Sequence, residues 1–112
     1  MSQLTTHILD TTKGKPAWGV TVVVYRQIAG EWIKLGKGLT NKDGRITNLL
    51  AEEYLMPFGT YKLSFDTKHY YEGMEIETFY PHVDIVFQIN STDHYHVPLL
   101  VSPFGYSTYR GS

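Results

Sequence analysis

The stretch that indicates the architecture most clearly is Gly19-Val-Thr-Val-Val-Val-Tyr-Arg-Gln-Ile28. It is rich in β-branched residues and is bounded by glycine at both ends, because Ala29-Gly30 follows it. β-Branched side chains fit a pleated, half-buried surface, so this stretch predicts a core strand. After the short turn, residues 31–39 alternate polar and apolar side chains, which predicts the second arm of a hairpin.

Six further short segments have the composition or alternation of strands, and they cover residues 5–9, 45–48, 59–65, 82–89, 95–101 and 105–109. About eight short strands at this spacing are typical of an antiparallel two-sheet β-sandwich. Residues 67–74 are the one helix candidate, with Asp66 or Thr67 as a candidate cap. The predicted fold is therefore all-β, with one short helix.

Length and charge limit the classes of protein. A chain of 112 residues predicts a single domain over residues 1–112. Ten Lys and Arg against eleven Asp and Glu give a net charge of −1, which argues against nucleic acid or an anionic membrane as a partner. No cysteine is present, so disulfides and thiolate sites are excluded. No apolar run approaches a membrane span and no secretory signal pattern is visible, so we expect a cytoplasmic protein.

Histidine and arginine provide the candidates for chemistry. Histidine supplies a base near neutral pH, and arginine supplies a fixed cationic fork. His7 lies on a predicted strand, and Arg45 follows the Asn41-Lys-Asp-Gly44 turn. His94 and His96 stand two apart on a strand, so we expect both on one face. Such a face would form a plausible wall for a small polar ligand.

Each candidate also has an ordinary structural interpretation. A single histidine in a strand is more often a satisfied or solvated residue than a catalyst, and an arginine after a turn is usually a surface charge. Arg110 either is a solvated tail residue or holds the tail by hydrogen bonds. His69 and His82 are assigned to the surface. The aromatic segment before Gly111 predicts that the tail is tied down rather than frayed.

Three motifs carry a resemblance to a known family. They are Leu4-Thr-Thr-His-Ile-Leu-Asp10 with Gly14-Lys-Pro-Ala17, then His94-Tyr-His-Val-Pro-Leu-Leu100, and last Tyr109-Arg-Gly-Ser112. Together they resemble the signature set of the 5-hydroxyisourate hydrolases, the transthyretin-related enzymes of urate breakdown. The resemblance covers essentially the whole chain. It implies a transthyretin-like fold and metal-independent, cofactor-free hydrolysis of 5-hydroxyisourate to 2-oxo-4-hydroxy-4-carboxy-5-ureidoimidazoline in purine degradation.

The resemblance also implies roles for particular residues. It implies catalytic roles for His7, Arg45 and His96, and it leaves open which histidine is the base. The substrate-binding residues that it implies are Tyr109, Arg110, Gly111 and Ser112. It further implies a homotetramer with its sites at a subunit interface, and the uncharged, aromatic segment 105–109 is a suitable edge for pairing with another copy.

Three alternatives stay open at this level. The first is a non-enzymatic carrier, because transthyretin, a carrier of thyroid hormones, also resembles this chain. The second is a zinc site made from His7, His94 and His96, although no acidic partner for these ligands is identifiable. The third is a structural or adhesive sandwich module, although such modules usually occur in longer chains.

Overall fold

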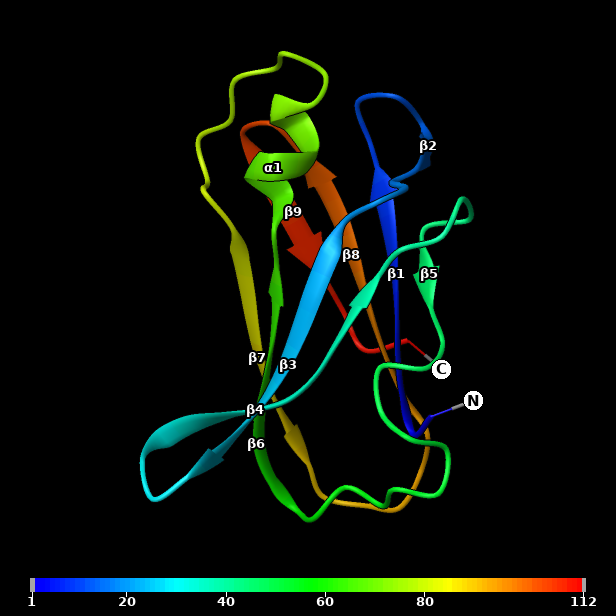
Figure 1. The fold of residues 1–112 in the computed structure, drawn as a ribbon, viewed down its shortest axis with the longest axis vertical. Helices are drawn as coiled ribbons and strands as arrows, with labels where there is room; N and C mark the ends of the chain where they lie inside the picture. The colour runs from blue at the N-terminus through cyan, green and yellow to red at the C-terminus, as the bar shows by residue number, and fades with distance from the viewer. Residues whose placement is uncertain (1, 112) are drawn as a thin grey trace.

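Two β-sheets packed face to face form the body of the protein in the computed structural model, which describes residues 2–111 (Figure 1). The first sheet has the order β2-β1-β8-β9, with β5 also paired to β1, and the second has the order β4-β3-β6-β7. The elements of the first sheet are β1 (Leu4–Asp10), β2 (Lys15–Pro16), β5 (Arg45–Ile46), β8 (Tyr95–Ser102) and β9 (Gly105–Thr108). The others are β3 (Thr21–Ile28), β4 (Glu31–Leu39), β6 (Gly59–Phe65), α1 (Thr67–Glu72) and β7 (Val83–Ile89).

The predicted sandwich is confirmed, and each of the eight predicted strands is present. Their ends differ from the prediction by one or two residues; β3 begins at Thr21, for example, and β5 ends at Ile46. The prediction missed β2, which consists of only Lys15 and Pro16 and pairs with the end of β1. A two-residue strand that contains proline has neither alternation nor β-branched residues, so its sequence pattern does not indicate a strand.

One strand pair departs from the predicted antiparallel arrangement. β1 and β8 run parallel, with a continuous register from Leu4 opposite Tyr95 to Asp10 opposite Val101. The other pairs in both sheets are antiparallel. The parallel pair places the first motif of the sequence directly beside the second, at a separation of about ninety residues along the chain.

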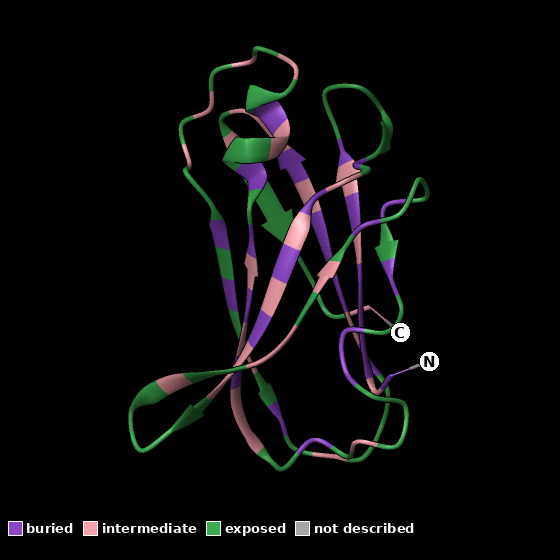
Figure 2. Ribbon diagram, viewed as in Figure 1, coloured by how far each residue is buried: buried purple, intermediate pink, exposed green. Residues whose placement is uncertain are grey.

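The core lies between the sheets and follows the alternation of the strands. Buried and exposed residues alternate along β7, and β6 buries Tyr61, Leu63 and Phe65 (Figure 2). From the first sheet, β1 contributes Leu4 and Ile8, which have no exposed surface. Apolar side chains that leave water in this way stabilise the fold by roughly 1.5–3 kcal/mol each.

Helix α1 is held by packing rather than by a capping side chain. Of the two predicted cap residues, Asp66 is the N-cap, although its side chain forms no cap hydrogen bond, and Thr67 already lies inside the helix. Instead, Tyr71 packs into the core, and the Tyr70 hydroxyl donates a hydrogen bond to Asp10 over 2.9 Å. The fully buried Asp10 thereby joins the helix to the end of β1.

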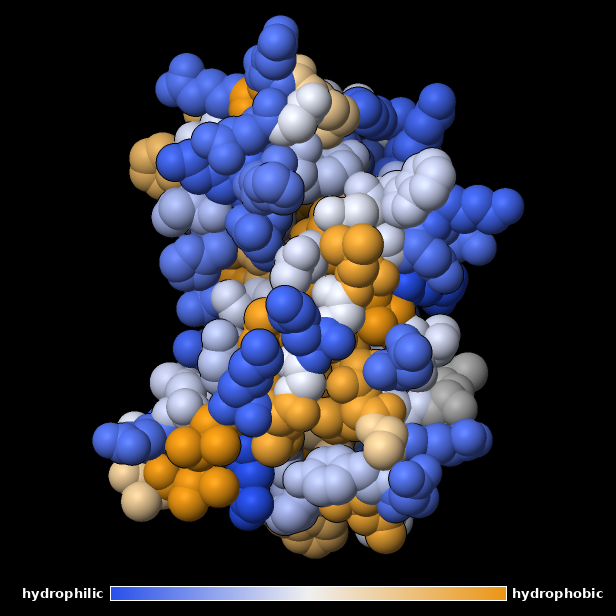
Figure 3. Space-filling model, in the orientation of Figure 1, coloured by the Kyte–Doolittle hydropathy of each residue, from blue (hydrophilic) through white to orange (hydrophobic). Residues whose placement is uncertain are grey.

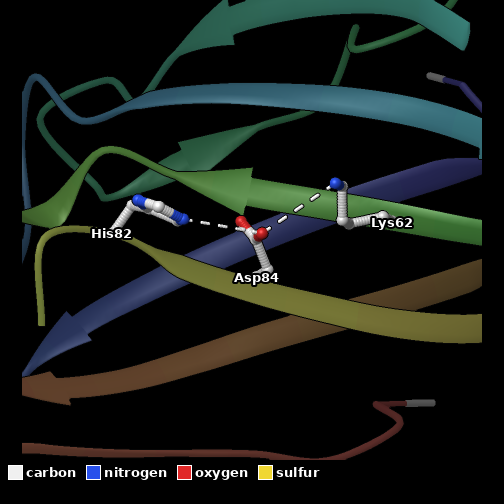
Figure 4. A network of polar contacts seen from close by, with 3 residues as sticks. All are labelled: Lys62, His82 and Asp84. Carbon is white, nitrogen blue, oxygen red and sulfur yellow. Dashed lines mark ion pairs between the residues drawn. The ribbon is translucent and has the colours of Figure 1, made fainter. Parts of the chain in front are cut away.

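The outer face of the second sheet carries ordinary surface contacts. The Asp84 carboxylate lies 3.6 Å from Nε2 of His82 and 3.9 Å from Nζ of Lys62, so the three side chains form a small polar group across β6 and β7 (Figure 4). Apolar surface is visible at the projecting end of the β3–β4 hairpin, where Ile28 and Ile33 are partly exposed (Figure 3). Within residues 2–111, no helix is both long and apolar enough to cross a membrane.

Candidate functional site

The outer face of the first sheet, which is the face turned away from the core, brings together three predicted site residues. His7 on β1 is opposite Arg45 on β5, and Thr5 on β1 is opposite His96 on β8. Directly opposed residues point to the same side of a sheet, and so do residues two apart on one strand. His7, Arg45 and His96 therefore share one face, although about ninety residues separate the first from the last.

A rigid turn holds Arg45 beside His7. The Asn41 side-chain oxygen accepts the backbone N–H of Asp43 at 2.9 Å and that of Arg45 at 3.0 Å. Gly44 has a positive φ of +73°, and a Cβ there would lie 2.5 Å from the carbonyl oxygen of Ile8. The Gly44 carbonyl also accepts the N–H of Ile8 at 2.8 Å. Glycine is required at this position, and the predicted Asn-Lys-Asp-Gly turn thus fixes the arginine against β1.

The electrostatic environment favours neutral histidines. Burial and then the positive charge of Arg45 lower the pKa of His7 below its ordinary value of 6.5, against a weaker raising effect of Asp43. Burial, followed by the charges of Arg45, His7 and His94, lowers the pKa of His96 in the same direction. No carboxylate within residues 2–111 forms an ion pair with Arg45. The face therefore offers neutral imidazoles beside a cation that forms no ion pair with the described carboxylates.

Gly111 is packed directly against His96. Its backbone N–H donates to the His96 carbonyl oxygen at 2.7 Å, which forms an isolated bridge next to the first sheet. A Cβ on Gly111 would lie 2.6 Å from Cδ2 of the imidazole ring. The prediction that the tail is tied down is confirmed at this residue, and only glycine leaves room for the ring.

We expect the Gly111→Ala variant to displace either the His96 ring or the end of the chain, because both cannot keep their places. Forcing a methyl group into a packed site costs about 1–3 kcal/mol. The displacement is measurable as a shift of the His96 ring resonances in NMR spectra, with thermal unfolding as a second measurement. Gly105→Ala is the matched control, since a Cβ there meets only the Ser102 hydroxyl at 3.6 Å. Unchanged His96 resonances in the Gly111 variant would contradict this packing.

The side chains of two predicted tail residues lie away from the face that carries His7 and His96. Tyr109 and Arg110 line a groove of about 280 Å³ at the open edge between the sheets, together with β7 residues. The Arg110 guanidinium lies 4.2 Å from the ring centroid of Tyr95, a cation–π contact on the core side of β8. Within one chain, these two side chains therefore do not share the face of His7 and His96. Ser112, the fourth predicted tail residue, lies outside the described residues.

Sequence reasoning missed Thr5. This residue is 4 % exposed, and its hydroxyl lies 3.0 Å from Nε2 of His94 and 2.8 Å from Nδ1 of His96. These contacts confirm that the two histidines share one face. The spacing of Thr5 and His7 could have identified Thr5, because residues two apart on a strand lie on the same side of it. His69 and His82 are exposed, as predicted.

The zinc alternative receives no support from side-chain geometry. In the part of the chain that the structure describes, no three His, Cys, Asp or Glu side chains are placed to hold a metal ion. The arrangement suits general-base chemistry better. A neutral imidazole can take a proton from water, and a fixed guanidinium can stabilise an oxygen that becomes negatively charged.

Comparison with known proteins agrees with this geometry. The model of the HIUase/Transthyretin family matches residues 4–111. A Mus musculus protein named 5-hydroxyisourate hydrolase is 48% identical over 114 residues, which cover 99% of this chain and 96% of the mouse protein.

Two solved structures have the same fold. The Klebsiella pneumoniae 5-hydroxyisourate hydrolase is 40% identical, with a TM-score of 0.84 and coverage of 97% of this chain and 98% of that one. Sea bream transthyretin in complex with thyroxine is 36% identical, with a TM-score of 0.91 and coverage of 97% and 94%. The match over almost the entire length, in sequence as well as in fold, shows that the chain belongs to the HIUase/Transthyretin family.

Proposed function

We propose that this protein hydrolyses 5-hydroxyisourate to 2-oxo-4-hydroxy-4-carboxy-5-ureidoimidazoline in urate degradation. The observation that carries the proposal is the grouping of His7, Arg45 and His96 on one face, with conditions that keep both imidazoles neutral. The similarity to the mouse and Klebsiella proteins named for this activity supports it. The cofactor-free reaction fits the chain, because a general base and a cationic donor each contribute roughly 10²-fold or more.

In the proposed mechanism, His7 and His96 position the attacking water and one of them takes its proton. The hydroxide oxygen forms a bond to the ring carbonyl carbon, and Arg45 stabilises the resulting oxyanion. Collapse of this intermediate breaks the bond between the carbon and the ring nitrogen. The imidazolium then returns its proton to the departing nitrogen, so that the ring opens and the neutral base is restored. The terminal segment shapes the pocket, and Gly111 fixes the His96 strand.

The alternative is a non-enzymatic carrier of a small molecule. The similarity to sea bream transthyretin, whose structure was determined with thyroxine, supports this alternative. A carrier has no need of two neutral imidazoles beside a cation, and an apolar ligand would gain little from them. We therefore place the enzyme first.

The test is to generate 5-hydroxyisourate in situ with urate oxidase and to follow its ultraviolet decay with and without the protein. We expect decay faster than the spontaneous rate, also in the presence of a metal chelator. Decay at the spontaneous rate with folded protein would reject the hydrolase, and thyroxine binding measured on the same sample would then favour the carrier. Loss of activity on addition of chelator would revive a metal-dependent mechanism.

We expect kcat/KM to fall as the pH drops, with a midpoint below 6.5. The base must be neutral, and burial and Arg45 lower the pKa of both His7 and His96 below that ordinary value. Lowering a histidine pKa keeps the neutral form present to lower pH, so protonation of the base itself should set in at lower pH than for an ordinary imidazole. A pH profile of the decay assay measures this directly. A flat profile down to about pH 5, or a midpoint above 6.5, would contradict a base on this face.

We also propose that the protein is a homotetramer with its sites at a subunit interface. Support comes from the open edges of β7 and β9 and from exposed apolar side chains there, namely Val86 on β7, Tyr106 on β9, and Phe104 and Tyr109 on either side of β9. Uncovered edges of this kind favour pairing with another copy. Analytical ultracentrifugation should give a mass four times the 12.8 kDa of one chain. A monomer that is fully active would contradict this proposal.

We also propose that residues 1–112 form one transthyretin-like hydrolase domain, of which the family model matches residues 4–111. We also propose that the protein is located in the cytoplasm, with which the absence of cysteine is compatible.

A further inference from the structure

A single hydroxyl group joins His94 to His96. Oγ1 of Thr5 lies 3.0 Å from Nε2 of His94 and 2.8 Å from Nδ1 of His96. Thr5 is 4 % exposed, and among residues 2–111 its hydroxyl has no third hydrogen-bond partner. The two imidazoles therefore compete for one hydroxyl, although His96 also has a backbone hydrogen bond to Thr5.

A hydroxyl group has one proton, and this limits the arrangements available to it. In the first, Nδ1–H of His96 donates to Thr5, and Thr5 donates to Nε2 of His94. The other ring nitrogen of His96, Nε2, then carries a free lone pair. In the second, Nε2–H of His94 donates to Thr5, Thr5 donates to Nδ1 of His96, and Nε2 of His96 carries the proton. If both imidazoles donated, the buried hydroxyl hydrogen would be left without an acceptor, which is costly.

We propose that His94 is a positioning residue that acts through the Thr5 hydroxyl and sets which nitrogen of His96 can take a proton. Neutral His94 permits the first arrangement, in which His96 is ready to act as a base. Protonated His94 has no acceptor nitrogen, so it imposes the second arrangement and turns the base off. The inference deepens the proposed hydrolase activity and rests on it for its effect on rate, but the coupling itself is a property of the protein without substrate.

The position of His94 suits this role. Its side chain is exposed to solvent, whereas Thr5 is buried and His96 is half-buried. Ionisable side chains from the neighbouring elements also lie near His94 and His96. His7 on β1 and Arg45 on β5 act on His96, and Glu52 and Tyr54 of the loop before β6 share a pocket with His94. Thr5 is the residue whose side chain contacts both imidazoles.

The direct test is NMR of the ligand-free protein with ¹⁵N-labelled histidine, recorded across the titration of His94. We expect the proton on neutral His96 to move from Nδ1 to Nε2 as His94 gains its charge. His94→Gln should abolish this movement, because the amide does not titrate. His69→Gln, at an exposed helix position, is the matched control and should leave the movement intact. A His96 tautomer that ignores the charge of His94 would overturn the proposal whether or not the protein is a hydrolase.

The decay assay gives the second measurement. Wild-type activity should fall more steeply with decreasing pH than that of His94→Gln, because two protonations rather than one disable the base. Thr5→Val should lower kcat about tenfold with little change in KM, because a tenfold change corresponds to the loss of about one ordinary hydrogen bond. Thr5→Ser keeps the hydroxyl and should retain the wild-type kcat. If Thr5→Val does not fold, Thr5→Ser and His94→Gln still decide the outcome. Equal steepness in wild type and His94→Gln, with active protein, would reject the coupling and leave the hydrolase standing.

Discussion

Replacement of His96 by Gln is expected to lower kcat/KM for 5-hydroxyisourate by about 10²- to 10⁴-fold, the range in which a positioned general base contributes. Glutamine retains a polar group that can bond the Thr5 hydroxyl, so the packing against Gly111 is disturbed little. It cannot accept a proton at neutral pH, so the loss isolates the proton transfer from the shape of the site.

The measurement is the ultraviolet decay of substrate generated by urate oxidase, with circular dichroism as the check that the variant is folded. His69→Gln is the matched control, because the same substitution at an exposed helix position should leave the rate unchanged. A similar loss in His7→Gln would indicate that the two imidazoles share the task. Wild-type activity in His96→Gln would remove this residue from the mechanism.

Replacement of Arg45 by Gln is expected to reduce kcat by about 10²- to 10³-fold, the usual effect of removing one donor to a developing oxyanion. The variant has a second expected effect, since the charge of Arg45 lowers the pKa of both His7 and His96. Its removal should raise both values, so the acidic limb of the pH profile should move to higher pH. Loss of rate and movement of the limb should therefore occur together.

Lys42→Gln is the control for this experiment, because it removes an exposed cation from the same turn without touching the Asn41 hydrogen bonds. Arg45→Lys should be intermediate, because an ammonium group keeps the charge but lacks the planar fork. If Arg45→Gln shifted the limb without slowing the reaction, the arginine would act on the histidines and not on the oxyanion.

Much of the fold could be predicted from local patterns in the sequence. The alternation of Tyr61, Leu63 and Phe65 and the β-branched run that contains Val22 and Val24 identify both the strands and their buried sides. The pattern does not say which strands are neighbours. The parallel pairing of β1 with β8 was therefore missed, because an alternating strand can pair in either direction with the same side chains buried.

In the candidate site, too, local patterns could be predicted and contacts between distant residues could not. His7, Arg45 and His96 were identified from motifs, and their common face follows from strand parity and a single turn. Thr5 was missed because threonine is common in strands and only its two contacts distinguish it. The resemblance groups Arg110 with the histidines. However, β9 ends at Thr108, and within one chain the Arg110 guanidinium packs against Tyr95 on the other side of β8. Such crossings depend on tertiary packing and leave no local signal.

The parallel pairing of β1 with β8 has a consequence for the order of events during synthesis and folding. Thr5 and His7 leave the ribosome about ninety residues before His96 and Gly111 do. Joining β1 to β8 closes a loop of most of the chain, and contacts of such long range form slowly. No nascent or truncated chain can thus display the assembled face, and β1 must wait with an unpaired edge until its partner emerges. The candidate site is a late product of folding, so its appearance reports completion of the whole domain.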